Sequence, residues 1–202
     1  MHFMRAFVIG NGESLLRTPL ELLIGQRTYA TNRIHHLYDR VVWRPSVYVR
    51  TEPPYAVDPV EFFAECRWHT QQGYECVYPD GWQEEVGVLA GHVRYLPTCR
   101  HFKYPPPHKK AHLDWHLPVI CDTSIITAAM QVAVLDGATE IVLLGCDLTG
   151  PHFSATDTGL IQTDVWVSQH EIAKRSCPVP IYNATVGGHL EIYERVNLLD
   201  ML

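Results

Sequence analysis

Short apolar runs separated by mixed and polar segments recur along the chain, and this alternation predicts an α/β fold. Parallel strands that are covered on both faces give nearly continuous apolar stretches of roughly four to eight residues. Segments of this kind, or with the alternation typical of a strand, occur at residues 6–9, 28–31, 46–50, 74–78, 141–145, 179–182 and 190–193. We therefore expect a central, mostly parallel sheet.

Helix signals lie between the predicted strands. The first long helix should begin at Asp58 and Pro59, which have the residue types of an N-cap and a first helical position. The predicted helices cover 59–72, 125–135 and 163–177, and shorter helical turns are expected at 15–24 and 34–38. A helix followed at once by a buried strand, as at 125–145, is half of a right-handed βαβ unit. The pattern predicts a single α/β domain over residues 1–202.

Periodicity fades between residues 83 and 117, where the chain carries three consecutive prolines, a cluster of histidines and two lysines. We expect an irregular excursion that covers the site, as a lid or an acceptor-binding loop. The four-residue spacing of the histidines would align them on one helical face as a metal site, but the neighbouring prolines and lysines favour a basic lid over phosphates. The residues concerned are His108, Lys109, Lys110, His112 and His116, and no metal site is predicted.

Composition and charge limit the class of protein. At 202 residues, 47% hydrophobic and 19% charged, the chain has the make-up of one ordinary globular domain. A net charge of -6 argues against a nucleic-acid-binding protein. No apolar run approaches the ~20 residues of a membrane span, and the first strand follows the N-terminus too closely for a signal peptide. The six cysteines include no Cys-x-x-Cys pair. We expect a soluble cytoplasmic protein, with monomer and oligomer both open.

The first strand ends in a glycine turn, Gly10-Asn11-Gly12, followed by Ser14 at the start of a helical segment. Glycines allow the backbone to approach an anion closely, and the free N–H groups of a first helical turn attract negative charge. The same residues also suit a strand-to-helix turn without a ligand. The position after the first strand of a parallel sheet favours a phosphate or nucleotide site.

Polar residues also follow other predicted strands. Asn32 and Arg33 come after the second strand, Arg50 ends the third, and Asp147 follows the run at 141–145. Because the carboxyl ends of parallel strands meet at one edge of the sheet, we expect these side chains to surround the glycine turn. Asn32 and Asp147 would also suit ordinary turn or cap positions.

Four separated pieces, taken in order, resemble the superfamily that joins MptE-like 6-hydroxymethylpterin diphosphokinases to bacterial lipooligosaccharide sialyltransferases. These pieces are Gly10 to Leu15, Thr31-Asn32-Arg33, the run from Asp122 to Asp147 that continues into Leu148, and Asn183-Ala184-Thr185. The region from Tyr55 to Trp115 lies outside the resemblance. The resemblance implies a Rossmann-like sheet whose glycine turn holds a nucleotide.

In the sialyltransferase branch, the resemblance implies that Asn11, Ser14 and Asn32 contact the cytidine monophosphate of the sugar donor. An asparagine amide offers both donors and acceptors and can therefore read a pyrimidine edge or hold a ribose. Further candidates for nucleotide contact are Gly10, Gly12, Arg33, Arg50, Asn183 and Thr185.

Residue chemistry favours the sialyltransferase branch over the diphosphokinase branch. A diphosphokinase would need Mg²⁺ held by an acidic pair beside the phosphates. Here Arg33 and Arg50 follow the second and third strands instead, and arginines can replace a metal cation beside a phosphate. The prediction is metal-independent transfer from a nucleotide sugar, CMP-linked by preference, to a small-molecule or glycan acceptor.

The catalytic residues depart from the sialyltransferase pattern. The resemblance implies a histidine base downstream of the strand end, with tyrosines beside it. His152 comes only five residues after Asp147, and no tyrosine lies between Asp147 and Tyr182. We expect His152 to act as base or phosphate donor and Asp147 to orient it or bind a hydroxyl, while His170 is expected to be structural. The alternatives are a Mg²⁺-dependent MptE-like diphosphokinase using ATP, and a nucleotide-binding protein without catalysis.

Overall fold

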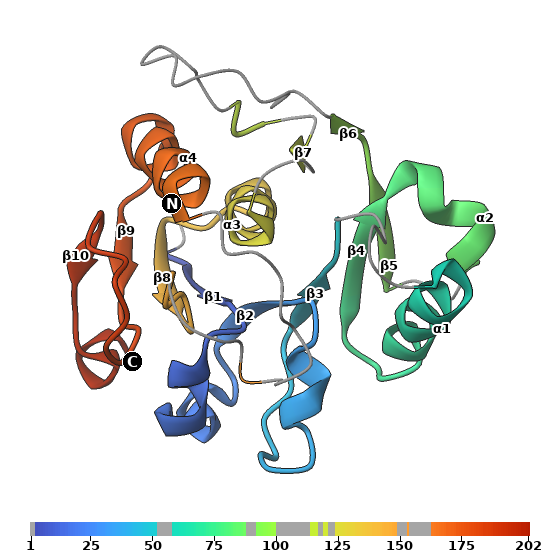
Figure 1. The fold of residues 1–202 in the computed structure, drawn as a ribbon, viewed down its shortest axis with the longest axis horizontal. Coiled ribbons are helices and arrows are strands. Elements are labelled where there is room, and N and C mark those ends of the chain that lie inside the picture. Colours follow the sequence, from blue (N-terminus) through green and yellow to red (C-terminus); the bar gives the residue numbers. More distant parts are fainter. Residues whose placement is uncertain are drawn as a thin grey trace.

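An eight-stranded sheet in which every strand pair is parallel forms the centre of the molecule (Figure 1). The computed structural model describes residues 3–51, 58–87, 92–99, 114–116, 119–120, 124–148, 153 and 163–202. The strands of this sheet are β1 (Arg5–Ile9), β2 (Arg27–Thr31), β3 (Val47–Val49), β4 (Glu75–Pro79), β5 (Val93–Leu96), β8 (Glu140–Leu144), β9 (Ile181–Asn183) and β10 (Glu194–Arg195). Two further short strands, β6 (Thr98–Cys99) and β7 (Val119–Ile120), pair with each other.

Helices cover both faces of the sheet, so the described part of the chain has an α/β architecture. The α-helices are α1 (Pro59–Thr70), α2 (Gln83–Val86), α3 (Ile125–Leu135) and α4 (Thr163–Ser176). The 3₁₀-helices are η1 (Glu13–Arg17), η2 (Leu20–Leu23), η3 (Ile34–Leu37), η4 (Asp80–Trp82) and η5 (Leu198–Met201). None of the helices in the described ranges is both long and apolar enough to cross a bilayer.

Alternation along the strands builds two hydrophobic cores. Ala6 and Val8 of β1 face a core shared with α3 and α4, whereas Phe7 and Ile9 face a core shared with α1 and the 3₁₀-helices. Successive side chains of a strand point to opposite faces, so one apolar run supplies both cores. α3 packs across β1, β2 and β3, which places its first turn near the carboxyl ends of these strands.

The strand order reverses next to β1. The order is β10-β9-β8-β1-β2-β3-β4-β5, so the chain first builds outward from β1 to β5 and later returns to place β8 on the other side of β1. In open parallel sheets, ligands bind outside the carboxyl ends of the strands at the point where the order reverses. The glycine turn after β1 and the segment after β8 lie at this point.

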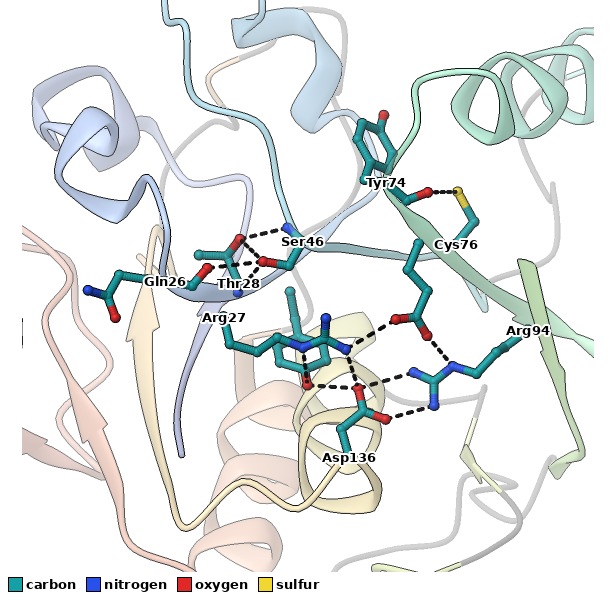
Figure 2. Close-up of polar contacts among 10 residues, drawn as sticks. Gln26, Arg27, Thr28, Ser46, Tyr74, Cys76, Arg94 and Asp136 are labelled. Carbon is teal, nitrogen blue, oxygen red and sulfur yellow. Dashed lines mark hydrogen bonds and ion pairs between the residues drawn. The ribbon is translucent and has the colours of Figure 1, made fainter. Parts of the chain in front are cut away.

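Ion pairs link strands and a helix at the opposite, amino-terminal edge of the sheet (Figure 2). Arg27 contacts Glu75 at 3.1 Å and Asp136 at 3.0 Å, and Arg94 contacts Asp136 at 2.7 Å as well as Glu75. The hydroxyl of Tyr29 donates to Asp136 at 2.8 Å. Two cations and two carboxylates therefore join β2, β4 and β5 to the C-terminal end of α3.

Most predicted elements are confirmed, including the α3 helix with Ser124 as N-cap and the α1 helix capped by Asp58. The interval 83–117 differs from the prediction, because it contains α2 and the sheet strand β5. The last strand lies at 194–195 rather than at 190–193. Residues 100–113, with most of the predicted lid, lie outside the described residues.

Candidate functional site

The glycine turn after β1 packs directly against the backbone that follows β8. The amide of Gly10 donates to the carbonyl of Leu144 at 2.8 Å, and that of Gly12 donates to Gly145 at 2.8 Å. A Cβ atom on Gly10 would lie 2.4 Å from the Gly145 carbonyl oxygen, a separation that packed atoms do not adopt. Gly10 is therefore required by the contact between the two central strands, whether or not a ligand binds.

A carboxylate of the chain occupies the start of η1. The Ser14 amide donates to Asp147 Oδ2 at 2.9 Å, and the Ser14 hydroxyl donates to Oδ1. A Cβ atom on Gly12 would lie 2.5 Å from Asp147 Cγ. From the sequence, the anionic part of a ligand was expected at this position, and Asp147 was expected to orient a base or bind a hydroxyl. In the structure Asp147 binds Ser14, and Gly12 leaves room for that carboxylate.

Unpartnered buried polar atoms gather at the carboxyl ends of β1, β2 and β3. Buried polar groups almost always find a hydrogen-bond partner, and one without a partner costs about 1–3 kcal/mol. Among the described residues, the side-chain atoms without a partner on the segments that end these strands, and in the first turn of α3, are Asn11 Oδ1, Asn32 Oδ1, Arg50 Nε, Thr51 Oγ1 and Thr127 Oγ1. We call this set the edge cluster. It contains acceptors, hydroxyls and a cationic donor, which is a combination suited to a nucleoside or a phosphate.

Contacts around the glycine turn join some of the elements that carry the edge cluster. Asn11 follows β1 and donates its amide to the backbone and hydroxyl oxygens of Thr31, at the end of β2, at 3.1 Å each. Ile126, the neighbour of Thr127 in the first turn of α3, lies against Gly10, because a Cβ there would be 3.2 Å from Ile126 Cδ1. The edge cluster therefore spans three strand ends and the N-terminal turn of one helix.

Asn32 has a left-handed backbone with φ 49°. This conformation is uncommon for residues other than glycine, and asparagine is among the residues that tolerate it. The hydroxyl of Tyr48 donates to the Asn32 carbonyl at 2.9 Å and holds the turn. The turn directs the chain from β2 into η3 while the Asn32 side-chain oxygen stays buried and without a partner.

Arg50 supplies a fixed positive charge at this edge. It is 9% exposed, its Nη1 lies 3.1 Å from Glu65 Oε1, and its guanidinium lies 4.8 Å from the centre of the Phe62 ring. These contacts leave Nε without a partner. Arg33, which precedes η3, is close enough to contribute to the lowered pKa of His35, so both arginines add positive potential near the ends of β2 and β3.

Asn183 and Thr185 reach the same edge after β9, but their polar groups support backbone. Asn183 Nδ2 donates to Leu190 at 2.7 Å, and its Oδ1 accepts from the Thr185 amide at 3.0 Å. The Thr185 hydroxyl accepts from the Cys146 amide at 3.1 Å. These bonds fix the backbone next to Asp147, the residue that binds Ser14. Asn183 and Thr185 therefore support the backbone of the site through these bonds.

The predicted histidines have different outcomes. His152, His108 and His112 lie outside the described residues, and His116 is exposed. His170 is buried, with Nδ1 at 3.0 Å from the hydroxyl of Tyr193. Burial lowers the pKa of His170 to about 4, so it stays neutral at pH 7 in a structural contact.

Sequence reasoning missed Thr51 and Thr127 of the edge cluster, and also a group formed by His35, Glu65 and His69, whose ligand atoms all lie within 4.8 Å of one another. The threonines carry no motif. The four-residue spacing of Glu65 and His69 within the predicted helix 59–72 was a usable signal, because such residues share one helix face.

A cavity of about 620 Å³ lies beside β9 and β10, and none of the described residues that line it belongs to the edge cluster. Its lining includes Leu22, Val186 and Leu199 and is mainly apolar. The one arginine in it, Arg195, is bound to the carbonyls of Thr185, Gly187 and Gly188 and to Glu191. An apolar lining with a fully engaged cation does not suit a nucleotide, so we place the candidate site at the edge cluster.

Comparisons of the chain with protein-family models, with curated proteins and with solved structures found no match. The resemblance drawn from the sequence motifs therefore stays a prediction.

Proposed function

We propose that the carboxyl edge of the sheet binds a nucleotide and that the protein is a glycosyltransferase using a nucleotide sugar, CMP-linked by preference. The observation that carries this proposal is the edge cluster, where five buried polar atoms from three strand ends and a helix start lack partners. Burial of polar groups is tolerated when a partner satisfies them, and a bound nucleotide is such a partner. The Rossmann-like interpretation of the fold belongs to the same proposal.

The residues divide the work by chemistry. The side-chain oxygens of Asn11 and Asn32 can accept from an amino group of a base or from a ribose hydroxyl. Arg50 supplies positive charge to the departing phosphate, which supports transfer without a metal ion. Asp147 excludes a phosphate from the first turn of η1, because its carboxylate already binds Ser14 there. The nucleotide would therefore lie beyond the glycine turn, toward β2, β3 and α3.

Transfer also needs a base for the acceptor hydroxyl, and His152 is the candidate from the sequence. Substituting His152→Gln should lower the transfer rate by roughly 10²–10⁴-fold while leaving nucleotide binding intact. If binding of the donor is lost in parallel, His152 belongs to the nucleotide contact and the base lies elsewhere.

A thermal-shift panel with CMP, CDP, UDP, GDP and ATP, each with and without Mg²⁺, tests the proposal. We expect stabilisation by CMP in the absence of Mg²⁺. The matched variant is Asn32→Gly, because glycine accepts φ 49° and removes only the side chain. Its CMP affinity should fall by roughly 10-fold, which is about 1.4 kcal/mol.

The same panel separates the alternatives. Stabilisation by ATP only with Mg²⁺ would replace the proposal with the diphosphokinase reaction. Binding of CMP without turnover of a CMP-sugar would indicate a nucleotide-binding protein without catalysis. If none of the nucleotides stabilises the protein, the edge cluster is not a nucleotide site.

A further inference from the structure

Three side chains outside the edge cluster bring together the ligand types of a transition-metal site. Glu65 and His69 lie one turn apart on α1, and His35 reaches them from η3. His35 Nδ1 lies 3.3 Å from His69 Nε2 and 3.9 Å from Glu65 Oε1. Two imidazole nitrogens and one carboxylate oxygen therefore face a common point.

These separations fit a metal ion. Zinc–nitrogen bonds of about 2.0–2.1 Å and a tetrahedral angle place neighbouring ligand atoms roughly 3.4 Å apart. The distance between the histidine nitrogens, which also suits a hydrogen bond between the two rings, matches this value. The Glu65 oxygen lies about half an ångström too far from His35 Nδ1, and all three ligand atoms lie within 4.8 Å of one another. A three-ligand set of two histidines and one carboxylate leaves a fourth position for water, as in open zinc sites.

The surroundings hold the ligands as outer contacts do in known metal sites. His69 is fully buried, its Nδ1 lies 2.5 Å from the hydroxyl of Tyr74, and its ring stacks on Tyr48 with centres 3.6 Å apart. A ligand histidine usually has its second ring nitrogen fixed by such a partner. The Tyr74 hydroxyl in turn accepts from Tyr38 at 3.3 Å, so the imidazole is fixed in place and orientation.

The group of ligands can be reached from solvent. The side chains of His35 and Glu65 are 20% and 25% exposed, which leaves a path for the ion from solvent.

The charge of Arg50 opposes a cation at this point. Its Nη1 donates to Glu65 at 3.1 Å, but an ionised carboxylate has enough lone pairs to accept this bond and coordinate a metal together. The nearby arginine lowers the affinity without removing the ligand. Arg50 also provides a test of the site. Removing its charge should strengthen metal binding, whereas a general loss of structure would weaken metal binding.

We propose that His35, Glu65 and His69 form a binding site for one divalent transition-metal ion of the zinc type. Imidazole and carboxylate ligands suit Zn²⁺ and Co²⁺ better than Mg²⁺. This proposal does not depend on the nucleotide site proposed above. Arg50 links the two, because it belongs to the edge cluster and also donates to Glu65.

The test is a titration of the chelator-treated full-length chain with Zn²⁺ by calorimetry and with Co²⁺ by visible absorption. We expect tetrahedral cobalt bands and one zinc equivalent. Its affinity should fall at least roughly 10-fold in Glu65→Gln and in His35→Ala, because loss of a ligand should cost no less than the roughly 10–100-fold known for loss of an outer contact. Arg50→Gln should bind zinc more tightly than the unmodified chain.

Matched controls separate this site from other histidines. Glu61→Gln changes an exposed residue on the same helix as Glu65 and His69 and should leave the zinc affinity unchanged. A His108, His112 and His116 triple alanine variant should also retain the site. The proposal is overturned if zinc does not bind, if Glu65→Gln and His35→Ala bind it as the unmodified chain does, or if the controls lose affinity equally. Near-ultraviolet circular dichroism on each variant shows whether its fold is intact.

Discussion

Single buried histidines make this protein sensitive to mild acid. His69 and His170 are 0% and 3% exposed, and burial lowers the pKa of His69 to about 2 and that of His170 to about 4. In the unfolded chain both would titrate near the ordinary value of about 6.5. Between these values the unfolded state binds more protons than the folded state, so the free energy of unfolding must fall as the pH falls.

We therefore predict that lowering the pH from 7 to 5 reduces the free energy of unfolding by about 2 kcal/mol for each of these two histidines. The loss begins near pH 6.5, and the part due to His170 levels off below about pH 4. Urea unfolding at several pH values measures it. His170→Asn should lose its own share of the pH dependence. A stability that does not change between pH 7 and pH 5 would contradict the assignment.

At the scale of secondary-structure elements, the close contact of β1 with β8 depends on glycine. A Cβ on Gly10 would meet a backbone oxygen at 2.4 Å, and backbone cannot move aside as a flexible side chain can. Gly81, in η4, has open space around the same position.

We expect Gly10→Ala to lower the free energy of unfolding by about 2–3 kcal/mol through this overlap. Gly81→Ala should be neutral or slightly stabilising, by up to about 1 kcal/mol, because it restricts the unfolded chain. Chemical denaturation of the two variants gives the comparison. Equal effects would mean that the β1–β8 contact is looser than described.

The ion-pair network at the amino-terminal edge makes a second prediction about elements (Figure 2). Asp136 is the common partner of Arg27, Arg94 and Tyr29, and its side chain is only 11% exposed. Asp136→Ala leaves two arginines with one carboxylate, so we expect a loss of about 2 kcal/mol, between the values for exposed and buried pairs. The exposed Asp39→Ala should change the free energy of unfolding by less than about 0.5 kcal/mol. A loss no larger than that of Asp39→Ala would show that the network is not stabilising.

The elements themselves could be read from the sequence where burial is complete. Most side chains of β1, β8 and α3 are buried, so these elements consist of nearly continuous apolar runs that predict them from the sequence. β5 was missed because it is a half-buried edge strand, Val93-Arg94-Tyr95-Leu96, whose arginine is retained by ion pairs with distant residues. Its place in the sheet depends on the strand next to it rather than on its own periodicity.

At the scale of the whole molecule, topology decides what the candidate site can be. Parallel strands bring Asn11, Asn32 and Arg50 to one edge, and this much followed from the sequence. The bond between Ser14 and Asp147 joins residues 133 positions apart, and no local pattern distinguishes such a cap from a catalytic carboxylate. The orphaned hydroxyls of Thr51 and Thr127 are likewise visible only once the fold is assembled.

One variant tests the central claim, that the edge cluster is built for a bound nucleotide. Thr127 is 1% exposed and its hydroxyl has no partner, whereas the buried Thr70 donates to the Arg67 carbonyl at 2.7 Å. Replacing an unsatisfied hydroxyl by an apolar group of similar shape is neutral or stabilising, but removing a satisfied one costs about 1 kcal/mol. Thr127→Val and Thr70→Val are therefore a matched pair.

The measurement is CMP affinity by calorimetry together with unfolding of the free protein for this pair. If the edge cluster binds the nucleotide, Thr127→Val should leave the free energy of unfolding of the free protein unchanged or raise it. The same variant should weaken CMP binding by roughly 5- to 10-fold, because one hydrogen bond to the ligand is lost. Thr70→Val should show the reverse, with lower stability and unchanged affinity. If Thr127→Val destabilises the protein and binds CMP as the unmodified chain does, the hydroxyl serves the fold and the account is contradicted.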